Sequence, residues 1–148
     1  MNEVLQKYFL YLLGKRDYSS GVLVKKALIK GYLEEEIKPV MIWLETKNFV
    51  NDVRLAENLV ENYKARKGKF WIQQKLSQKF ISREIIAKVM EYEETQPAEK
   101  LKEKVCRKYK IENWQEIEPA TKMKIVGFLS RNGYGNSFEI LEKWVNKE

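Results

Sequence analysis

The fold of this chain is decided by a stretch that occurs twice, 49 positions apart. Residues 23–43 read LVKKALIKGYLEEEIKPVMIW, and residues 72–92 read IQQKLSQKFISREIIAKVMEY. Apolar or identical residues align as Leu23 with Ile72, Ala27 with Leu76, Lys30 with Lys79, Tyr32 with Ile81, Ile37 with Ile86, Val40 with Val89, Met41 with Met90 and Trp43 with Tyr92. A period of this size is typical of one supersecondary unit that is stacked several times, each copy burying its apolar face on the next.

A weaker third copy lies in the C-terminal third of the chain. It places Ile125 where the first copy has Leu23, 102 positions earlier, and one inserted residue then aligns Ile140 with Ile37. The expected architecture is an elongated, curved, solenoid-like array, which favours an extended binding surface over an enclosed catalytic pocket. The predicted repeats are residues 1–49, 50–96 and 97–148.

Apolar residues keep a helical spacing throughout the chain, so each repeat is expected to contain three helices. In the first repeat, Ser19 or Ser20 caps the middle helix, and Gly31 ends it in the left-handed conformation. Pro39 lies inside the next helix, so either the first turn is distorted or the helix starts near Ile37. No segment alternates polar and apolar residues over a strand's length, and the predicted fold class is therefore all-α.

The later repeats follow the same plan. A helix is expected from Asp52 to Arg66, a second from Phe70 to Lys79 after a break at Gly68, and a third from Arg83, with Ser82 as its cap. Pro97 and Pro119 suit the first turns of helices in the third repeat. Residues 93–97 are the one stretch that reads as a joint between repeats.

Composition limits the class of protein. The chain has 148 residues, a net charge of +7 and one cysteine, Cys106. The positive charge indicates polyanionic partners. Apolar runs such as Tyr8–Leu13 fall far short of the roughly 18 residues that span a bilayer, and no small-residue cleavage site follows them. A lone cysteine forms no internal disulfide, so we expect a cytoplasmic protein with no membrane partner.

Acidic residues are absent from three windows, and each window contains the middle helix of its repeat. The windows are residues 18–33, 62–83 and 119–138. If the repeats stack with a constant rotation, their basic residues line one continuous face. The alternative is that these charges only keep helix surfaces soluble. Candidate residues for binding a partner or DNA are Lys25, Lys26, Lys30, Lys64, Arg66, Lys67, Lys69, Trp71, Lys75, Lys79, Arg83, Lys122, Lys124 and Arg131.

Trp71 is the aromatic member of that set. It follows a basic segment at the entry to a middle helix, where it would stack on a base or on a partner. Packing in the core is the alternative.

Residues for catalysis are scarce. The chain has no histidine, and so it lacks the commonest general base and metal ligand. Cys106 lies among cations but has no histidine to activate it, and the acidic run 34–36 suits a helix N-terminus. We therefore expect no enzyme activity, no metal and no cofactor.

The order of motifs along nearly the whole chain resembles the RecX regulators of the bacterial recombinase RecA. The motifs are Lys15–Ser19, Lys30–Tyr32, Asn48–Asp52, Lys64–Gly68, Gln78–Glu84, Lys122–Ile125 and Phe128–Tyr134. Two positions where the family usually has glycine differ. Asn48 tolerates the left-handed conformation, whereas at Phe80 the spacing favours an altered turn with a partly buried ring.

The resemblance implies a three-repeat helical protein that lies in the groove of the RecA–DNA filament. It implies inhibition of filament growth, of RecA ATPase and of strand exchange in DNA recombination, repair and the SOS response. The expected partners are the RecA filament and single- or double-stranded DNA, with the chain itself a monomer.

Two other classes of protein stay open: a stand-alone nucleic-acid-binding protein that uses the basic face, and a helical adaptor for an acidic protein surface. Filament capping, groove blocking and monomer displacement are equally compatible with the sequence.

Overall fold

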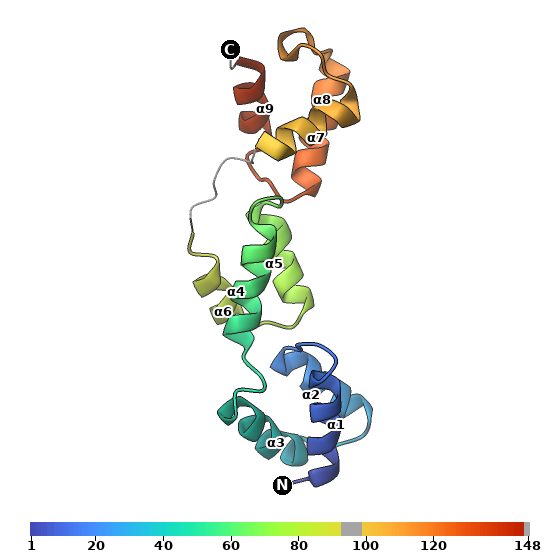
Figure 1. The fold of residues 1–148 in the computed structure, drawn as a ribbon, viewed down its shortest axis with the longest axis vertical. Helices are drawn as coiled ribbons and strands as arrows, with labels where there is room; N and C mark the ends of the chain where they lie inside the picture. The colour runs from blue at the N-terminus through green and yellow to red at the C-terminus, as the bar shows by residue number, and fades with distance from the viewer. Residues whose placement is uncertain (93–98, 147–148) are drawn as a thin grey trace. The chain divides into compact units, whose positions relative to one another are not determined.

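The computed structural model describes residues 1–92 and 99–146. Within them the chain forms nine α-helices and one short 3₁₀-helix, without a strand, which confirms the all-α prediction (Figure 1). The elements are α1 (Glu3–Leu13), α2 (Ser20–Ile29), α3 (Glu34–Thr46), α4 (Asp52–Tyr63), α5 (Lys69–Gln78), α6 (Arg83–Val89), α7 (Glu99–Tyr109), η1 (Trp114–Glu116), α8 (Pro119–Arg131) and α9 (Ser137–Asn146). No helix in these residues combines the length and hydropathy of a membrane span.

Side-chain caps begin several of these helices. Ser19, rather than Ser20, is the N-cap of α2, and its hydroxyl accepts a hydrogen bond from the N–H of Val22. Asn2 and Asn51 lie 49 positions apart and accept the corresponding bonds at the starts of α1 and α4, both at 3.0 Å. The repeat therefore includes the asparagine side chains that cap the starts of α1 and α4.

Left-handed residues end the three middle helices at one repeat position. The φ angles of Gly31, Phe80 and Gly133 are 96°, 59° and 92°. In each case the next residue donates its N–H to the carbonyl five positions earlier, which is the bond of a Schellman cap. These donor–acceptor pairs are Tyr32 to Ala27 at 3.1 Å, Ile81 to Leu76 at 3.2 Å and Tyr134 to Leu129 at 3.1 Å.

The altered turn predicted at Phe80 is wrong. This residue adopts the left-handed conformation that glycine adopts in the other two repeats, and 48% of its surface is exposed. Gly21 faces it so closely that a β-carbon there would lie 2.7 Å from the Phe80 β-carbon. The missing side chain at position 21 thus leaves room for a phenylalanine cap. Asn48 is also left-handed, with φ of 60°, as expected.

The structure decides where one helix starts and corrects the predicted end of another. Helix α3 starts at Glu34, so Pro39 lies inside it and the later start near Ile37 does not occur. Helix α4 ends at Tyr63, before the predicted Arg66, because Arg66 donates its N–H to the Tyr63 carbonyl in a tighter turn at 3.0 Å.

By their internal contacts the residues divide into two compact units. The first unit is Met1–Leu59 with Lys75–Glu91, and the second is Val60–Gln74 with Tyr92–Glu148. The repeat bounds 1–49, 50–96 and 97–148 stay predictions beside this division. Of the joint predicted at 93–97, no residue lies within the described part of the chain, and this includes the predicted first-turn Pro97.

The first unit has a core beneath α1, α2 and α3, which gather together in Figure 1. Leu5 and Phe9 of α1 are fully buried, as the helical spacing predicts. The buried residues of this core are Leu5, Phe9, Leu23, Ala27, Ile37, Val40, Met41, Leu44 and Val50.

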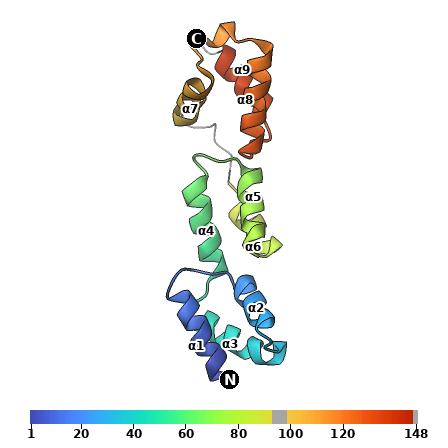
Figure 2. The ribbon, with the colours of Figure 1, turned by 90° about the vertical axis from the view of Figure 1, so that its right-hand side faces the viewer.

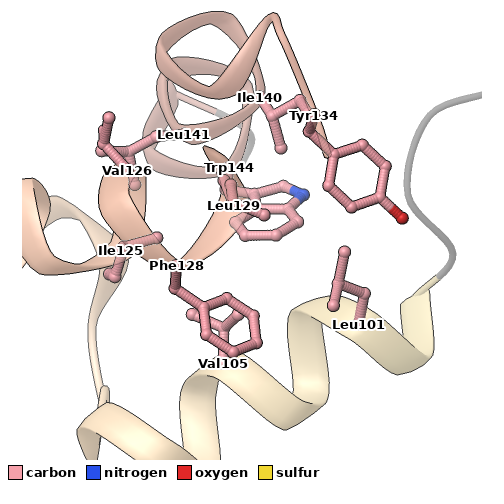
Figure 3. Packing of buried hydrophobic residues seen from close by; sticks show 10 residues of the cluster. All are labelled: Leu101, Val105, Ile125, Val126, Phe128, Leu129, Tyr134, Ile140, Leu141 and Trp144. Atoms are coloured by element: carbon pink, nitrogen blue, oxygen red, sulfur yellow. The ribbon is translucent and has the colours of Figure 1, made fainter. Parts of the chain in front are cut away.

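The second unit has its core between α7, α8 and α9, which lie together in Figure 2. Figure 3 shows Leu101 and Val105 of α7 pointing into the cluster that contains Phe128 of α8 and Trp144 of α9. The Trp144 ring lies 5.4 Å from that of Trp114, centre to centre, and only 5% of Trp144 is exposed. Trp144 is therefore an aromatic anchor of this core.

In the first unit, the start of α2 meets the end of α5. The Ser19 hydroxyl donates a hydrogen bond to the Lys79 carbonyl. Ser20 donates from its N–H and its hydroxyl to the two carboxylate oxygens of Asp52, at 2.8 and 2.5 Å. We call this contact the first junction; its residues are Ser19, Ser20, Gly21, Asp52, Lys79 and Phe80.

In the second unit, the start of α5 meets the end of α8. Gly68 donates its N–H to the Asn132 carbonyl at 2.8 Å, and Phe70 donates to the Gly133 carbonyl at 3.2 Å. A β-carbon on Gly133 would lie 2.4 Å from the backbone nitrogen of Trp71. We call this contact the second junction; its residues are Gly68, Phe70, Trp71, Asn132 and Gly133.

Candidate functional site

The predicted basic residues of the first unit lie on or beside α2, α5 and α6. Lys25, Lys30, Lys79 and Arg83 are exposed, whereas Lys26 and Lys75 are half-buried. Lys25 and Lys26 are on α2, Lys30 is its C-cap, Lys75 is on α5, Lys79 follows α5, and Arg83 begins α6.

Aromatic rings hold three of these ammonium groups. The Lys30 Nζ lies 4.1 Å from the centre of the Tyr8 ring, and the Lys25 Nζ lies 4.8 Å from that of Phe80. Lys26 is similarly 5.6 Å from the Tyr18 ring. A ring beneath the ammonium limits its motion without neutralising its charge, so these cations stay available to an anion.

The second unit contains the other predicted residues. Lys64, Arg66 and Lys67 lie in the turn between α4 and α5, Lys69 and Trp71 lie on α5, and Lys122, Lys124 and Arg131 lie on α8. Lys64, Arg66, Lys124 and Arg131 are exposed, and the other four are half-buried.

The cations of the α4–α5 turn have different surroundings. Lys64 forms an ion pair with Glu61 at 2.8 Å. Arg66 stacks on Tyr63, with its guanidinium carbon 4.7 Å from the ring centre. Lys67 donates from Nζ to the side-chain oxygen of Asn132. The turn therefore does not present one uniform basic cluster.

Trp71 packs within the second unit. Its ring lies 4.7 Å from that of Tyr63 and 5.0 Å from the Lys67 Nζ, and its backbone contacts Gly133 closely. The half-buried ring has an evident packing role, while a stacking contact with a base or partner stays a prediction.

The fold adds a residue that the acid-free windows do not contain. Lys104 of α7 lines a cavity of about 430 Å³ together with Arg66 and Lys67. The other lining residues are Asn62, Ala65, Leu101, Phe128 and Asn132. Because Lys104 follows Glu103 in the sequence, only the packing of α7 against α8 reveals that it belongs with this cluster.

The electrostatics of the cavity are visible at Lys67. Burial lowers the pKa of its ammonium group below the ordinary value of 10.5, and the positive charges of Lys104 and Arg66 lower that pKa further. The positive charges of Lys104 and Arg66 thus act on Lys67 within one site, and an anion bound there would offset their repulsion.

Groups for catalysis or metal binding are not assembled in the described residues. No cluster of three or more His, Cys, Asp or Glu side chains there is arranged to hold a metal ion. Cys106 is a half-buried thiol on α7. What the described surfaces offer is anion binding through lysine and arginine side chains.

The family model and the relatives that match this chain carry the same name, RecX. The family model described as RecX, second three-helix domain, matches residues 51–90. The regulatory protein RecX of Haemophilus influenzae (strain PittGG) is 33% identical over 138 residues, covering 90% of this chain and 89% of the relative. The protein of the same name from Pelodictyon phaeoclathratiforme is 30% identical over 131 residues, covering 86% of this chain and 79% of the relative.

Solved structures agree on the fold. The crystal structure of RecX from Lactobacillus salivarius has a TM-score of 0.74 at 19% identity, covering 98% of this chain and 94% of that one. A crystal structure of regulatory protein RecX has a TM-score of 0.70 at 20% identity, with coverages of 95% and 72%. Both confirm the predicted architecture of three three-helix repeats.

Proposed function

This chain belongs to the RecX family of regulatory proteins, and on that premise we propose that it binds the RecA–DNA filament and inhibits filament growth. Loss of filament then lowers RecA ATPase and strand exchange. The observation that carries the proposal is the relationship to RecX proteins over about nine-tenths of both chains. RecX regulatory proteins are non-enzymatic, and family membership thus confirms that this chain is a regulator rather than an enzyme.

The distribution of charge supports binding to a nucleoprotein filament. Both units present exposed lysine or arginine side chains from the middle helices or next to them, and the net charge of the chain is +7. A filament of protein on DNA is a polyanion with repeating sites, so several weak contacts along it add to a strong one. We also propose that the chain acts in the bacterial cytoplasm, where such a filament forms, and that it acts as a monomer.

Co-sedimentation with RecA filaments on single-stranded DNA tests the proposal. The wild-type chain is expected to sediment with the filament and to lower RecA ATPase measured in the same mixture. Replacing the exposed cations Lys25, Lys79 and Arg83 by Glu is expected to weaken both effects, because it reverses charge on the predicted face.

A matched control reverses charge elsewhere. Lys38 and Lys47 are exposed and lie outside the acid-free windows, so Glu at these positions and at Lys7 changes the net charge equally. Equal losses in the two triple variants would attribute binding to net charge and contradict the assigned face.

A second candidate is stand-alone binding to nucleic acid, which the cation-lined cavity of the second unit favours. The two functions differ in their dependence on RecA. Tight binding to bare DNA with a steep salt dependence, together with unchanged RecA ATPase, would establish the second candidate.

A further inference from the structure

The cavity of the second unit gathers cations from two separate parts of the chain. Arg66 and Lys67 enter it from the α4–α5 turn, and Lys104 enters it from α7. Among the residues that the structure describes, no acidic side chain forms an ion pair with any of these three. Three cations that converge without an acid favour a ligand that has negative charge.

The hydrogen bonds already present leave donors for a ligand. Lys67 uses Nζ for one bond to the side-chain oxygen of Asn132, and an ammonium group has three donors. Arg66 uses Nε for a bond to the Asn62 carbonyl at 3.3 Å, and a guanidinium group has five. The Asn132 amide is itself engaged, since its nitrogen donates to the Phe128 carbonyl at 2.8 Å.

The remainder of the lining is apolar, apart from the exposed amide of Asn62. Ala65, Leu101 and Phe128 contribute this surface. The volume of about 430 Å³ falls within the range of about 300–1,000 Å³ that is usual for small-molecule sites, and it exceeds what a single inorganic ion fills. The ligand that matches is therefore an anion joined to a less polar group.

We propose that this cavity binds a nucleotide, with the phosphate at Arg66, Lys67 and Lys104 and the base against the apolar lining. A phosphate suits three cations better than a carboxylate does, because it presents more acceptor oxygens and a monoester has more than one negative charge. The Asn62 amide is placed to hydrogen-bond the edge of the base. The phosphate comes either from a free nucleotide, as a monoester, or from a single strand, as a diester with one negative charge, and the experiment below separates these two sources.

The proposal goes beyond the proposed function, because it concerns a ligand of the isolated chain without RecA. Its test is an amide NMR titration of the full chain with thymidine monophosphate. The amides of the lining residues are expected to shift, and thymidine without phosphate is expected to shift them far less. Replacing Lys104 by Gln is expected to weaken the affinity about tenfold, as for the loss of one charge-assisted hydrogen bond.

Arg107→Gln is the matched control, because Arg107 is an exposed cation on the same helix that does not line the cavity. Its affinity for thymidine monophosphate is expected to equal that of the wild type. A five-residue oligothymidylate separates the two sources: tighter binding than the mononucleotide assigns the site to a strand, and weaker binding assigns it to a free nucleotide.

Two results would overturn the site: wild-type affinity in Lys104→Gln, or equally tight binding of a glutamate-rich peptide at the same amides. Filament co-sedimentation is measured in parallel, so that a failure of the nucleotide site can be distinguished from a failure of the proposed function. Filament binding without any response to thymidine monophosphate rejects the nucleotide site alone. A nucleotide response without filament binding rejects the proposed function alone.

Discussion

The two junctions occupy the same positions in successive repeats, but they are built from different chemistry. In the first, serine side chains donate to the Lys79 carbonyl and to the Asp52 carboxylate. In the second, the main chain of Gly68 and Phe70 donates directly to main-chain carbonyls. One contact therefore depends on side chains, whereas the other depends on how closely two backbones approach.

The difference follows from which partner lacks a side chain. In the first junction, the helix start has Gly21 and the left-handed cap is Phe80. In the second, 49 positions after Gly21, the helix start has Phe70 and the cap is Gly133. The space at the second junction is left by two glycines, because a β-carbon on Gly133 would lie 2.4 Å from the Trp71 nitrogen and one on Gly68 would press on the Gly133 carbonyl. The second junction therefore lets two backbones approach each other more closely than the first, where only Gly21 lacks a side chain.

The largest expected effect comes from Gly133→Ala. The new β-carbon would lie 2.4 Å from the Trp71 nitrogen and 2.5 Å from its β-carbon, at a φ of 92°. Left-handed strain of about 1–2 kcal/mol and overpacking of about 1–3 kcal/mol predict a total loss of about 2–5 kcal/mol of unfolding free energy. Urea denaturation measures this loss.

Gly31→Ala is the control for that change. Gly31 has the same cap geometry, with φ of 96°, but no atom lies within 4 Å of the place that its β-carbon would take. Only the strain of about 1–2 kcal/mol is expected. Equal losses at Gly31 and Gly133 would show that backbone contact adds nothing to the second junction.

Gly21→Ala is expected to cost about 1–3 kcal/mol, because its β-carbon would press on Phe80 at 2.7 Å. The double change with Phe80→Gly removes the contact between the two β-carbons and leaves only the contact of 2.8 Å with the carbonyl oxygen of residue 80. The double variant should therefore be more stable than Gly21→Ala alone, as a double-mutant cycle measures. If the changes in unfolding free energy of the two single variants simply add in the double variant, the two positions are not coupled, and this account of the first junction is wrong.

A smaller effect is expected from Ser20→Ala. It removes the hydroxyl that donates to Asp52 at 2.5 Å and leaves the backbone bond at 2.8 Å. We expect a loss of about 1 kcal/mol, the usual net value of one hydrogen bond. Thermal unfolding detects it, and the matched serine-to-alanine change at Ser77, which is exposed on α5, is expected to have less effect.

The smallest expected effect is a pH dependence at Lys67 beside the second junction. Its folded-state pKa is lowered, first by burial and then by Lys104 and Arg66, so the unfolded chain binds its proton more tightly. Stability relative to Lys67→Gln should therefore rise as the pH increases from the lowered pKa toward 10.5. Denaturation of both proteins across this range measures the difference, and a decrease would contradict the assigned direction.

Local signals predict much of this structure. The Ser19 and Ser82 caps and Pro119 at a helix start are short-range patterns, and the structure confirms each of them. The period of 49 residues can also be read directly from the sequence, and the left-handed caps at Gly31 and Phe80 follow it. The family follows from the order of motifs, and the comparisons confirm it. These features depend on neighbours in the chain, which a sequence displays directly.

Features that depend on distant residues were not predictable in the same way. The cap at Phe80 depends on Gly21, and the cavity depends on Lys104 reaching Arg66 and Lys67 through the packing of α7. Of the predicted binding residues, Lys67 and Trp71 have packing contacts that composition does not reveal. Whether any of the predicted residues binds a partner stays a prediction.

The contact between Gly21 and Phe80 also limits which residues each of the two positions can accept. A phenylalanine at the cap fits only opposite a residue without a β-carbon, since that atom would lie 2.7 Å from its own. A β-carbon at position 21 would also lie 2.8 Å from the carbonyl oxygen of residue 80, so this position requires glycine whichever residue forms the cap. The close approach of the two backbones therefore fixes Gly21, and the space that Gly21 leaves lets the cap position accept a side chain as large as phenylalanine.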